Sequence, residues 1–159
     1  GLAFSTAGIV FAAMQAGGFV GRLAFGWVAD RVGSGVVVVR IAATGSIASA
    51  LVLAIAQPGW GAATLIALGG AIGIVGAGWN GVQLSEIARR SPPSAIGETA
   101  AGATTFVFAG FVLGPAGFGI ALAQVGSFAH VFAGLAAVPA LALALSLAVP
   151  RFVSATESS

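Results

Sequence analysis

The chain has 159 residues, of which 58% are hydrophobic and only 6% are charged, with a formal net charge of +2. Soluble domains carry about 25% charged residues and disordered chains are more polar still, so both classes are excluded. Cysteine is absent, which excludes disulfides and cysteine-based metal sites. Six scattered basic residues make no phosphate-binding stripe, so no nucleic-acid partner is expected. The composition predicts a membrane protein. Because the chain begins with Gly1 and no basic leader, we expect it to be a piece of a longer protein.

Charged residues are so rare that the intervals between them indicate the membrane-spanning helices. Only Arg22 interrupts residues 1–29, and no charge occurs in 41–85 or 99–150. As single helices, these two intervals would be about twice as long as the roughly 30 Å hydrocarbon core, so each must fold back once. Turn-forming residues at 57–61 and 124–127 mark the reversals. We therefore predict an all-α membrane protein with about five transmembrane helices, at about 5–29, 36–56, 61–85, 98–122 and 128–149.

The arginines test this count independently. With five helices, the loops near 30–40 and 86–98 and the C-terminal tail share one side of the membrane. Those segments hold five of the six arginines, and the two turns on the other side hold none. Arginine collects in cytoplasmic loops, so we expect a cytoplasmic C-terminus. The five arginines are Arg31, Arg40, Arg89, Arg90 and Arg151.

Glycine and proline patterns describe the helices further. Three glycine pairs are spaced four apart, at 17 and 21, 69 and 73, and 110 and 114, which favours close helix packing or, alternatively, sliding faces. The segment 76–81 matches G-x-G-x-x-G, but no strand precedes it, so a dinucleotide site is rejected. Pro115 and Pro139 should bend the fourth and fifth helices, and bent helices suit a transporter better than a static anchor.

A charged motif ends the first predicted helix. Residues 26–33 read Gly-Trp-Val-Ala-Asp-Arg-Val-Gly, a G-x-x-x-D-R-x-G pattern. It resembles the cytoplasmic loop signature of the major facilitator superfamily (MFS) of secondary transporters. Gly78-Trp79-Asn80-Gly81 and the loop from Glu86 to Glu98 are also similar to the tenth helix of bacterial members and the loop after it. Ser34 and Gly35 stand where the family often has two basic residues, which favours the weaker second copy of the signature.

The resemblance implies that the chain corresponds to helices 8 to 12 of the family, part of the C-terminal six-helix half. It implies a bacterial inner-membrane transporter whose partners are a small-molecule solute, membrane lipid, the N-terminal half of the same protein and a coupling proton or ion. No cofactor or metal is implied. The resemblance also implies a cytoplasmic gate, whose candidate residues are Gly21, Arg22, Gly26, Asp30, Arg31 and Gly33.

Four gate residues have a physical rationale of their own. Asp30 lies at a helix C-terminus, where the helix dipole is already negative, so it should seek a positive partner elsewhere. The alternative is a solvated loop pair with Arg31. Arg22 lies about 12 Å earlier along the helix. Its side chain should either extend to the membrane interface or form a bond within the gate, and the alternative role is to bind an anionic solute. Gly26 and Gly33 would permit close approach and a sharp turn.

Few polar side chains lie within the predicted helices. Gln15 is near the middle of the first, while Asn80 and Gln83 share one face of the third beside Trp79. These four residues are the candidate solute cavity, and an interhelical hydrogen bond is the alternative role for the amides. For Thr104 and Thr105 a role in helix packing is favoured over a role in the cavity, because threonine readily forms a hydrogen bond to the backbone of its own helix. His130 falls near the outer end of the fifth helix, and no acidic residue lies deep in any helix, so a proton carrier would belong to the other half.

The sequence contains no catalytic constellation, neither a Ser-His-Asp set nor paired carboxylates, so an enzyme is not expected. The first functional hypothesis is an MFS-type secondary transporter that moves a small solute by alternating access. The alternative is a non-transporting multi-pass scaffold or assembly protein whose glycine faces bind partner helices.

Overall fold

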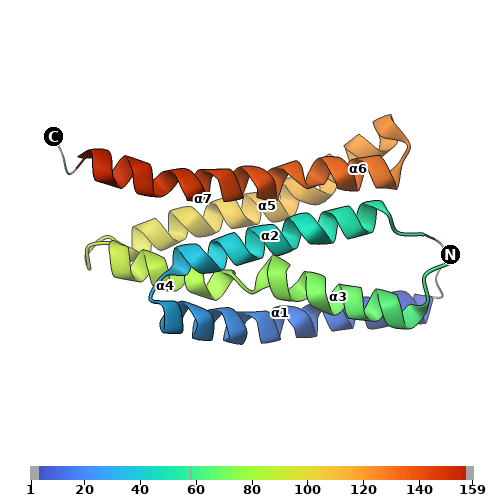
Figure 1. The fold of residues 1–159 in the computed structure, drawn as a ribbon, viewed down its shortest axis with the longest axis horizontal. Helices are drawn as coiled ribbons and strands as arrows, with labels where there is room; N and C mark the ends of the chain where they lie inside the picture. The colour runs from blue at the N-terminus through green and yellow to red at the C-terminus, as the bar shows by residue number, and fades with distance from the viewer. Residues whose placement is uncertain (1–3, 58, 157–159) are drawn as a thin grey trace.

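The computed structural model describes residues 4–57 and 59–156, and in those ranges every regular element is an α-helix (Figure 1). Five segments are long and apolar enough to cross a membrane, as expected for a multi-pass membrane protein. They are α1 (Phe4–Val32), α2 (Gly35–Ala54), the pair α3 (Ala62–Ala77) and α4 (Asn80–Arg90), α5 (Ile96–Val125), and a segment from Phe128 to Ala148 formed by α6 (Phe128–Leu135) and the start of α7 (Ala137–Thr156).

The helices run roughly antiparallel and place the connections at two ends (Figure 1). The α1–α2 connection, the α4–α5 connection and the end of α7 lie together; we call this the arginine-rich end, because Arg31, Arg89 and Arg90 close α1 and α4 there. The α2–α3 and α5–α6 turns lie at the opposite end. Gly126, with φ +67°, ends α5 at the second predicted reversal, and the first predicted reversal includes Pro58, which lies outside the described residues.

Two of the five predicted helices keep their membrane-spanning length but contain a short interruption of the regular hydrogen-bonding pattern, and the residues at both interruptions retain right-handed helical backbone angles. The third, predicted as one helix over 61–85, breaks at Gly78 and Trp79, between α3 and α4. The fifth, predicted over 128–149, breaks at Ala136. The second break has a local cause: Pro139 offers no N–H to the Leu135 carbonyl four residues earlier, and its ring crowds that carbonyl. Pro115 behaves differently, because α5 continues as a helix on both sides of it.

The closest helix contact joins α1 to α3, and glycines on both helices allow the two backbones to approach. A Cβ added at Gly17 would meet the backbone of Gly70, and one added at Gly73 would meet the carbonyl of Met14. In lipid, where burying apolar side chains gains little, small residues allow this backbone approach and the van der Waals contact it brings. Two of the three predicted pairs, 17 with 21 and 69 with 73, therefore pack here. At Gly110 and Gly114, an added Cβ would have nothing within 4 Å.

The buried core is small and lies toward the arginine-rich end. It consists of Phe25 and Ala29 of α1, Val38 and Ala42 of α2, and Val82 of α4. In contrast, α5 buries none of its residues, and Phe106 on it is 82% exposed. A helix that is apolar all round is suited to lipid or to a protein neighbour rather than to water. The chain thus packs α1 against α3, and α2 against α3, α6 and α7, and leaves α5 without a buried residue.

Candidate functional site

The break in the third membrane-spanning segment lies beside polar side chains that the sequence singled out. Gly78 still donates its N–H to Ile74 at 3.1 Å, and the helix resumes at Asn80. The Trp79 indole N–H donates to the Gly76 carbonyl at 3.0 Å, an oxygen that the N–H of Asn80 would reach in a continuous helix. An indole thus supports backbone at the break, which is how broken helices are tolerated at membrane depth.

A cavity of about 670 Å³ opens between this break and α5; we call it the helix-break cavity. Asn80 and Gln83 line it from α4, and the Oδ1 atom of Asn80 is buried without a hydrogen-bond partner among the described residues. The sequence-predicted residues Trp79, Asn80 and Gln83 therefore lie at one cavity. Its full lining is Gly76, Trp79, Asn80, Gln83, Ala103, Phe106, Val107, Gly110 and Phe111.

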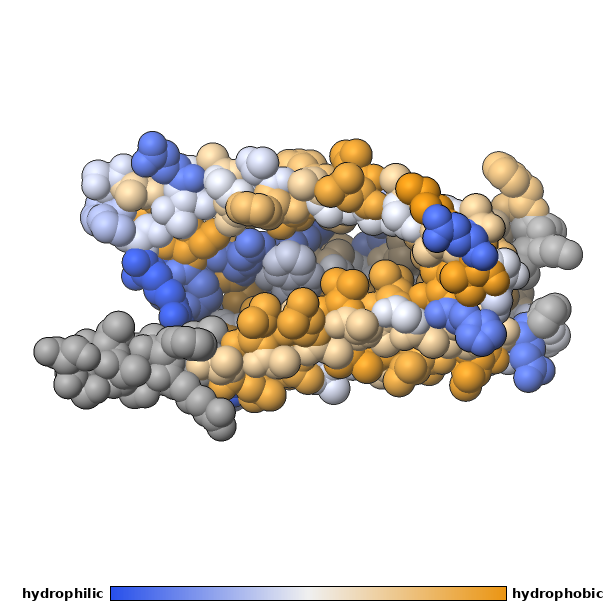
Figure 2. Space-filling view, turned by 90° about the horizontal axis from the view of Figure 1, so that it is seen from above, coloured by the Kyte–Doolittle hydropathy of each residue, from blue (hydrophilic) through white to orange (hydrophobic). Residues whose placement is uncertain are grey.

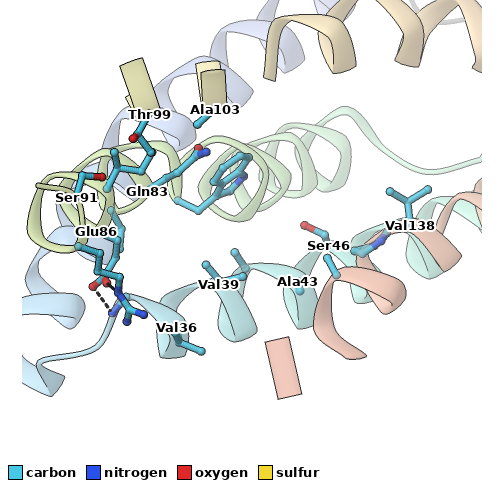
Figure 3. A pocket seen from close by; sticks show the side chains of 18 of the residues that line it. Val36, Val39, Ala43, Ser46, Gln83, Glu86, Ser91, Thr99, Ala103 and Val138 are labelled. Atoms are coloured by element: carbon cyan, nitrogen blue, oxygen red, sulfur yellow. Dashed lines mark hydrogen bonds and ion pairs between the residues drawn. The ribbon is translucent and has the colours of Figure 1, made fainter. Parts of the chain in front are cut away.

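A second, larger cavity of about 1050 Å³ adjoins the first and shares Trp79, Gln83 and Ala103 with it; we call it the α2–α7 cavity. Figure 2 shows the molecule hollowed between two layers of largely apolar side chains. In Figure 3, Gln83 of α4 lies close to Ala103 of α5 on one side, while Val39 and Ala43 of α2 line the other. Valine and alanine are the commonest residues in its walls, and among the described lining residues Glu86 and Arg90 are the charged ones.

Glu86 organises the arginine-rich end of the α2–α7 cavity. Its Oε1 accepts the backbone N–H of Gly35 at 2.9 Å and also contacts the Arg89 guanidinium, while its Oε2 accepts from Arg90 Nε at 2.8 Å (Figure 3). The Glu86 side chain is only 18% exposed, against 51% and 63% for the two arginines. Ser34, at the N-cap position of α2, makes no side-chain cap. Glu86 therefore caps α2 from another helix, and its negative charge suits the positive end of the helix dipole.

Arg40 was counted with the arginines near 30–40, and it lies inside α2, as the predicted helix over 36–56 also has it. The connection before α2 consists of Gly33 and Ser34, because α1 continues to Val32, three residues beyond its predicted end, and α2 begins at Gly35, where Glu86 accepts the first free N–H. The partly buried Arg40 side chain donates through Nη2 to the backbone carbonyl of Ser146 in α7 at 2.9 Å. This bond links two helices that lie far apart in sequence, and interior partners are what an intramembrane charge requires.

Four of the six candidate gate residues, Gly26, Asp30, Arg31 and Gly33, lie in the last two turns of α1 or directly after it. Asp30 is exposed and makes no ion pair or hydrogen bond within the described residues, while Arg31 lies 4.7 Å from the Trp27 ring centroid. Gly33 has φ +68° and donates its N–H to Ala29 at 2.8 Å, so it makes the sharp turn that a side chain would strain. A Cβ at Gly26 would meet nothing within 4 Å, and no close approach involves it here.

The remaining predicted residues occupy other places. Gly21 is buried against Ile74 in the α1–α3 contact, while Arg22 beside it is exposed. Gln15 is also exposed and lines neither cavity, so the structure does not bring it to Asn80 and Gln83. Thr105 donates its hydroxyl to the carbonyl of Ala101, as expected for a threonine that bonds its own helix.

Sequence reasoning missed Glu86 as a site residue. The available signal was its isolation: no other acidic residue occurs between Asp30 and Glu98, and two arginines follow it at three and four positions. That spacing predicts ion pairs on one helix face. Its contact with Gly35 crosses 51 residues of chain, and no local pattern could have indicated it.

Comparison with known proteins adds no relative: no family model, no curated protein and no solved structure matches the chain.

Proposed function

We propose that the chain is part of a secondary transporter of the major facilitator type, corresponding to helices 8 to 12, which moves a small solute across a bacterial inner membrane by alternating access. The observation that carries the proposal is the cavity beside the third segment, which the amides of Asn80 and Gln83 line just after the helical hydrogen bonding is interrupted. The break lies about 24 Å along a segment of roughly 42 Å. Transporters commonly place solute sites near the bilayer midplane, where the regular hydrogen bonding of membrane-spanning helices is interrupted.

Asp30, near the C-terminal end of α1, supports the same function. An exposed carboxylate at a helix C-terminus gains nothing from its own helix, and it has no ion-pair partner within the described residues. Under the proposal, its partner belongs to the N-terminal half, and their contact closes the cytoplasmic side. The arginine-rich end is then cytoplasmic, as the distribution of basic residues favours.

The alternative, a non-transporting scaffold or assembly protein, is favoured by one specific observation. None of the residues of α5 is buried, and its described glycines have nothing within 4 Å of an added Cβ. An open small-residue face can bind a partner helix. The helix-break cavity favours the transporter over this alternative, because a scaffold has no need of a cavity lined by polar amides within a membrane-spanning segment.

The test is reconstitution of the full-length protein into liposomes, with a panel of radiolabelled neutral, cationic and anionic solutes supplied with and without a proton gradient. The proposal expects saturable accumulation of at least one solute that empty liposomes do not show. Helical, correctly inserted protein that moves no member of the panel would instead support the scaffold.

A further inference from the structure

The α2–α7 cavity is polar at one end and mostly apolar along the rest of its length. Figure 3 shows polar side chains of α4 and α5 grouped at the arginine-rich end, with Val39, Ala43 and Val138 placed away from them. Ser46 adds a hydroxyl to the apolar part. A cavity divided in this way suits an amphipathic molecule, because its few polar groups fix the orientation of the occupant. The polar lining residues at the arginine-rich end are Gln83, Glu86, Arg90, Ser91 and Thr99.

The apolar part is long enough to hold an acyl chain. The lining residues on α2 run from Gly35 to Ala50, which is about 22 Å of helix. The acyl chains of one leaflet fill about half of the roughly 30 Å hydrocarbon core, so a lipid chain fits within this length. Lipid chains are as apolar as these walls, so a chain moves from the bilayer into the cavity at little cost or gain. The choice of lipid must therefore come from its head group.

Arg90 supplies a positive group where that head group would lie. It ends α4, and the third membrane-spanning segment ends with it. Its ion pair with Glu86 uses Nε, at 2.8 Å, and the two Nη atoms carry the other N–H donors of the guanidinium. The Arg90 side chain is 63% exposed, so a head group can reach it. The Ser91 hydroxyl is a second donor in the lining, whereas the Thr99 hydroxyl already donates to the carbonyl of Ala95.

The sign of the charge at this end favours an anion. Glu86 is the one carboxylate in the lining described here, and it already accepts from Arg89, Arg90 and the N–H of Gly35. Two arginines against one carboxylate leave a net positive charge, beside the positive end of the α2 dipole. A guanidinium also matches the geometry of phosphate oxygens better than a point charge does.

We propose that the α2–α7 cavity binds one acyl chain of an anionic phospholipid, whose phosphate accepts hydrogen bonds from Arg90 and Ser91. The proposal goes beyond solute transport and does not depend on it, because it concerns a cavity that a membrane lipid fills from the bilayer. Its requirements are the charge at the arginine-rich end and the apolar walls along α2 and α7.

Four ligands separate the head group from the chain. Dioleoylphosphatidylglycerol is anionic, dioleoylphosphatidylcholine is zwitterionic, dioleoylglycerol has no phosphate, and free glycerol phosphate has no acyl chain. Their dissociation constants are measured for the full-length protein in detergent by native mass spectrometry. We expect phosphatidylglycerol to bind about fivefold more tightly than phosphatidylcholine or dioleoylglycerol, the contribution of one arginine near a membrane surface. A large molar excess of free glycerol phosphate should not displace it.

Matched variants assign the binding to this cavity. Arg90→Gln should weaken the binding of phosphatidylglycerol about fivefold, whereas Arg89→Gln, which removes the other arginine paired with Glu86 but no lining residue, should weaken it less than about twofold. Val39→Trp should fill the apolar part and weaken all three diacyl ligands, whereas Ile41→Trp, at an exposed position of α2 outside the lining, should not. If Val39→Trp does not fold, the two arginine variants still decide the result.

Three results would overturn the proposal. Equal binding of phosphatidylglycerol and phosphatidylcholine by the unaltered protein would show that charge does not select the lipid. Equal losses in Arg89→Gln and Arg90→Gln would show a general attraction of the arginine-rich end for anions, with no role for the cavity. Displacement of phosphatidylglycerol by free glycerol phosphate would show that the arginine binds a soluble phosphate and that the acyl chain contributes nothing.

Discussion

The carboxylate of Glu86 in α4 accepts the first backbone N–H of α2, that of Gly35, at 2.9 Å. The contact fixes the start of one membrane-spanning helix against the end of another, at the arginine-rich end. A Cβ at Gly35 would overlap the Glu86 side chain, so the glycine is needed for the close approach. Arg89 and Arg90 in turn hold the carboxylate in place, although surface ion pairs by themselves contribute little.

Replacing Glu86 should therefore destabilise the helix bundle. We expect Glu86→Ala to lower the free energy of unfolding by about 1–3 kcal/mol, because it removes a charge-assisted cap and leaves the Gly35 N–H unpaired. Reversible unfolding in sodium dodecyl sulfate, followed by circular dichroism, measures the loss. The matched control is Glu98→Ala, which removes an exposed carboxylate from the first turn of α5 and should cost less than about 1 kcal/mol. Equal losses for both variants would show that the Glu86 contact contributes no specific stability.

The glycine contact between α1 and α3 gives a second prediction, in which two chemically identical changes should act in opposite directions. Gly73→Ala should destabilise by about 1–3 kcal/mol, because the new methyl group meets the Met14 carbonyl. Gly102→Ala, on the open face of α5, should be neutral or stabilise by up to about 1 kcal/mol through higher helix propensity. The same unfolding measurement compares them. A stable Gly73→Ala protein would contradict the packing of α1 on α3.

Much of this architecture could be predicted from the sequence, because the responsible forces act locally. Membrane thickness and charge-free intervals gave the number of helices, and glycine spacing indicated the α1–α3 contact. The interruption at Gly78 and Trp79 could not be predicted, since both residues keep right-handed helical backbone angles and no proline marks the position. The contact between Glu86 and Gly35 and the link from Arg40 to Ser146 join residues 51 and 106 positions apart, so they depend on how helices assemble. Gln15 was predicted to line the cavity only because it lies near the middle of its helix, and that position does not determine which face of the helix its side chain occupies.

Asp30 tests the gate that the proposed function requires. Asp30→Asn in the full-length protein should reduce the initial rate of solute uptake roughly tenfold, within the usual range of conformational coupling, because the neutral amide cannot hold a cationic partner. Membrane insertion and the unfolding midpoint should not change, since Asp30 is exposed and makes no ion pair within the described residues. Initial rates in proteoliposomes measure the effect, with Glu98→Gln as an exposed carboxylate control. Uptake by Asp30→Asn at the unaltered rate would remove the gate from the mechanism.

Membrane topology can be tested directly, because the chain contains no cysteine of its own. Gly59→Cys places a thiol in the exposed α2–α3 turn, and Ser94→Cys places one in the exposed α4–α5 connection. A charged maleimide that cannot cross membranes should label the Gly59→Cys variant in intact cells and the Ser94→Cys variant only in inside-out vesicles. This outcome follows from an odd number of crossings with the arginines inside, since basic loops stay in the cytoplasm. Labelling of both thiols from the same side would mean that the segment Ala62–Arg90 does not cross the membrane, and the helix-break cavity would then lose the setting on which its proposed role depends.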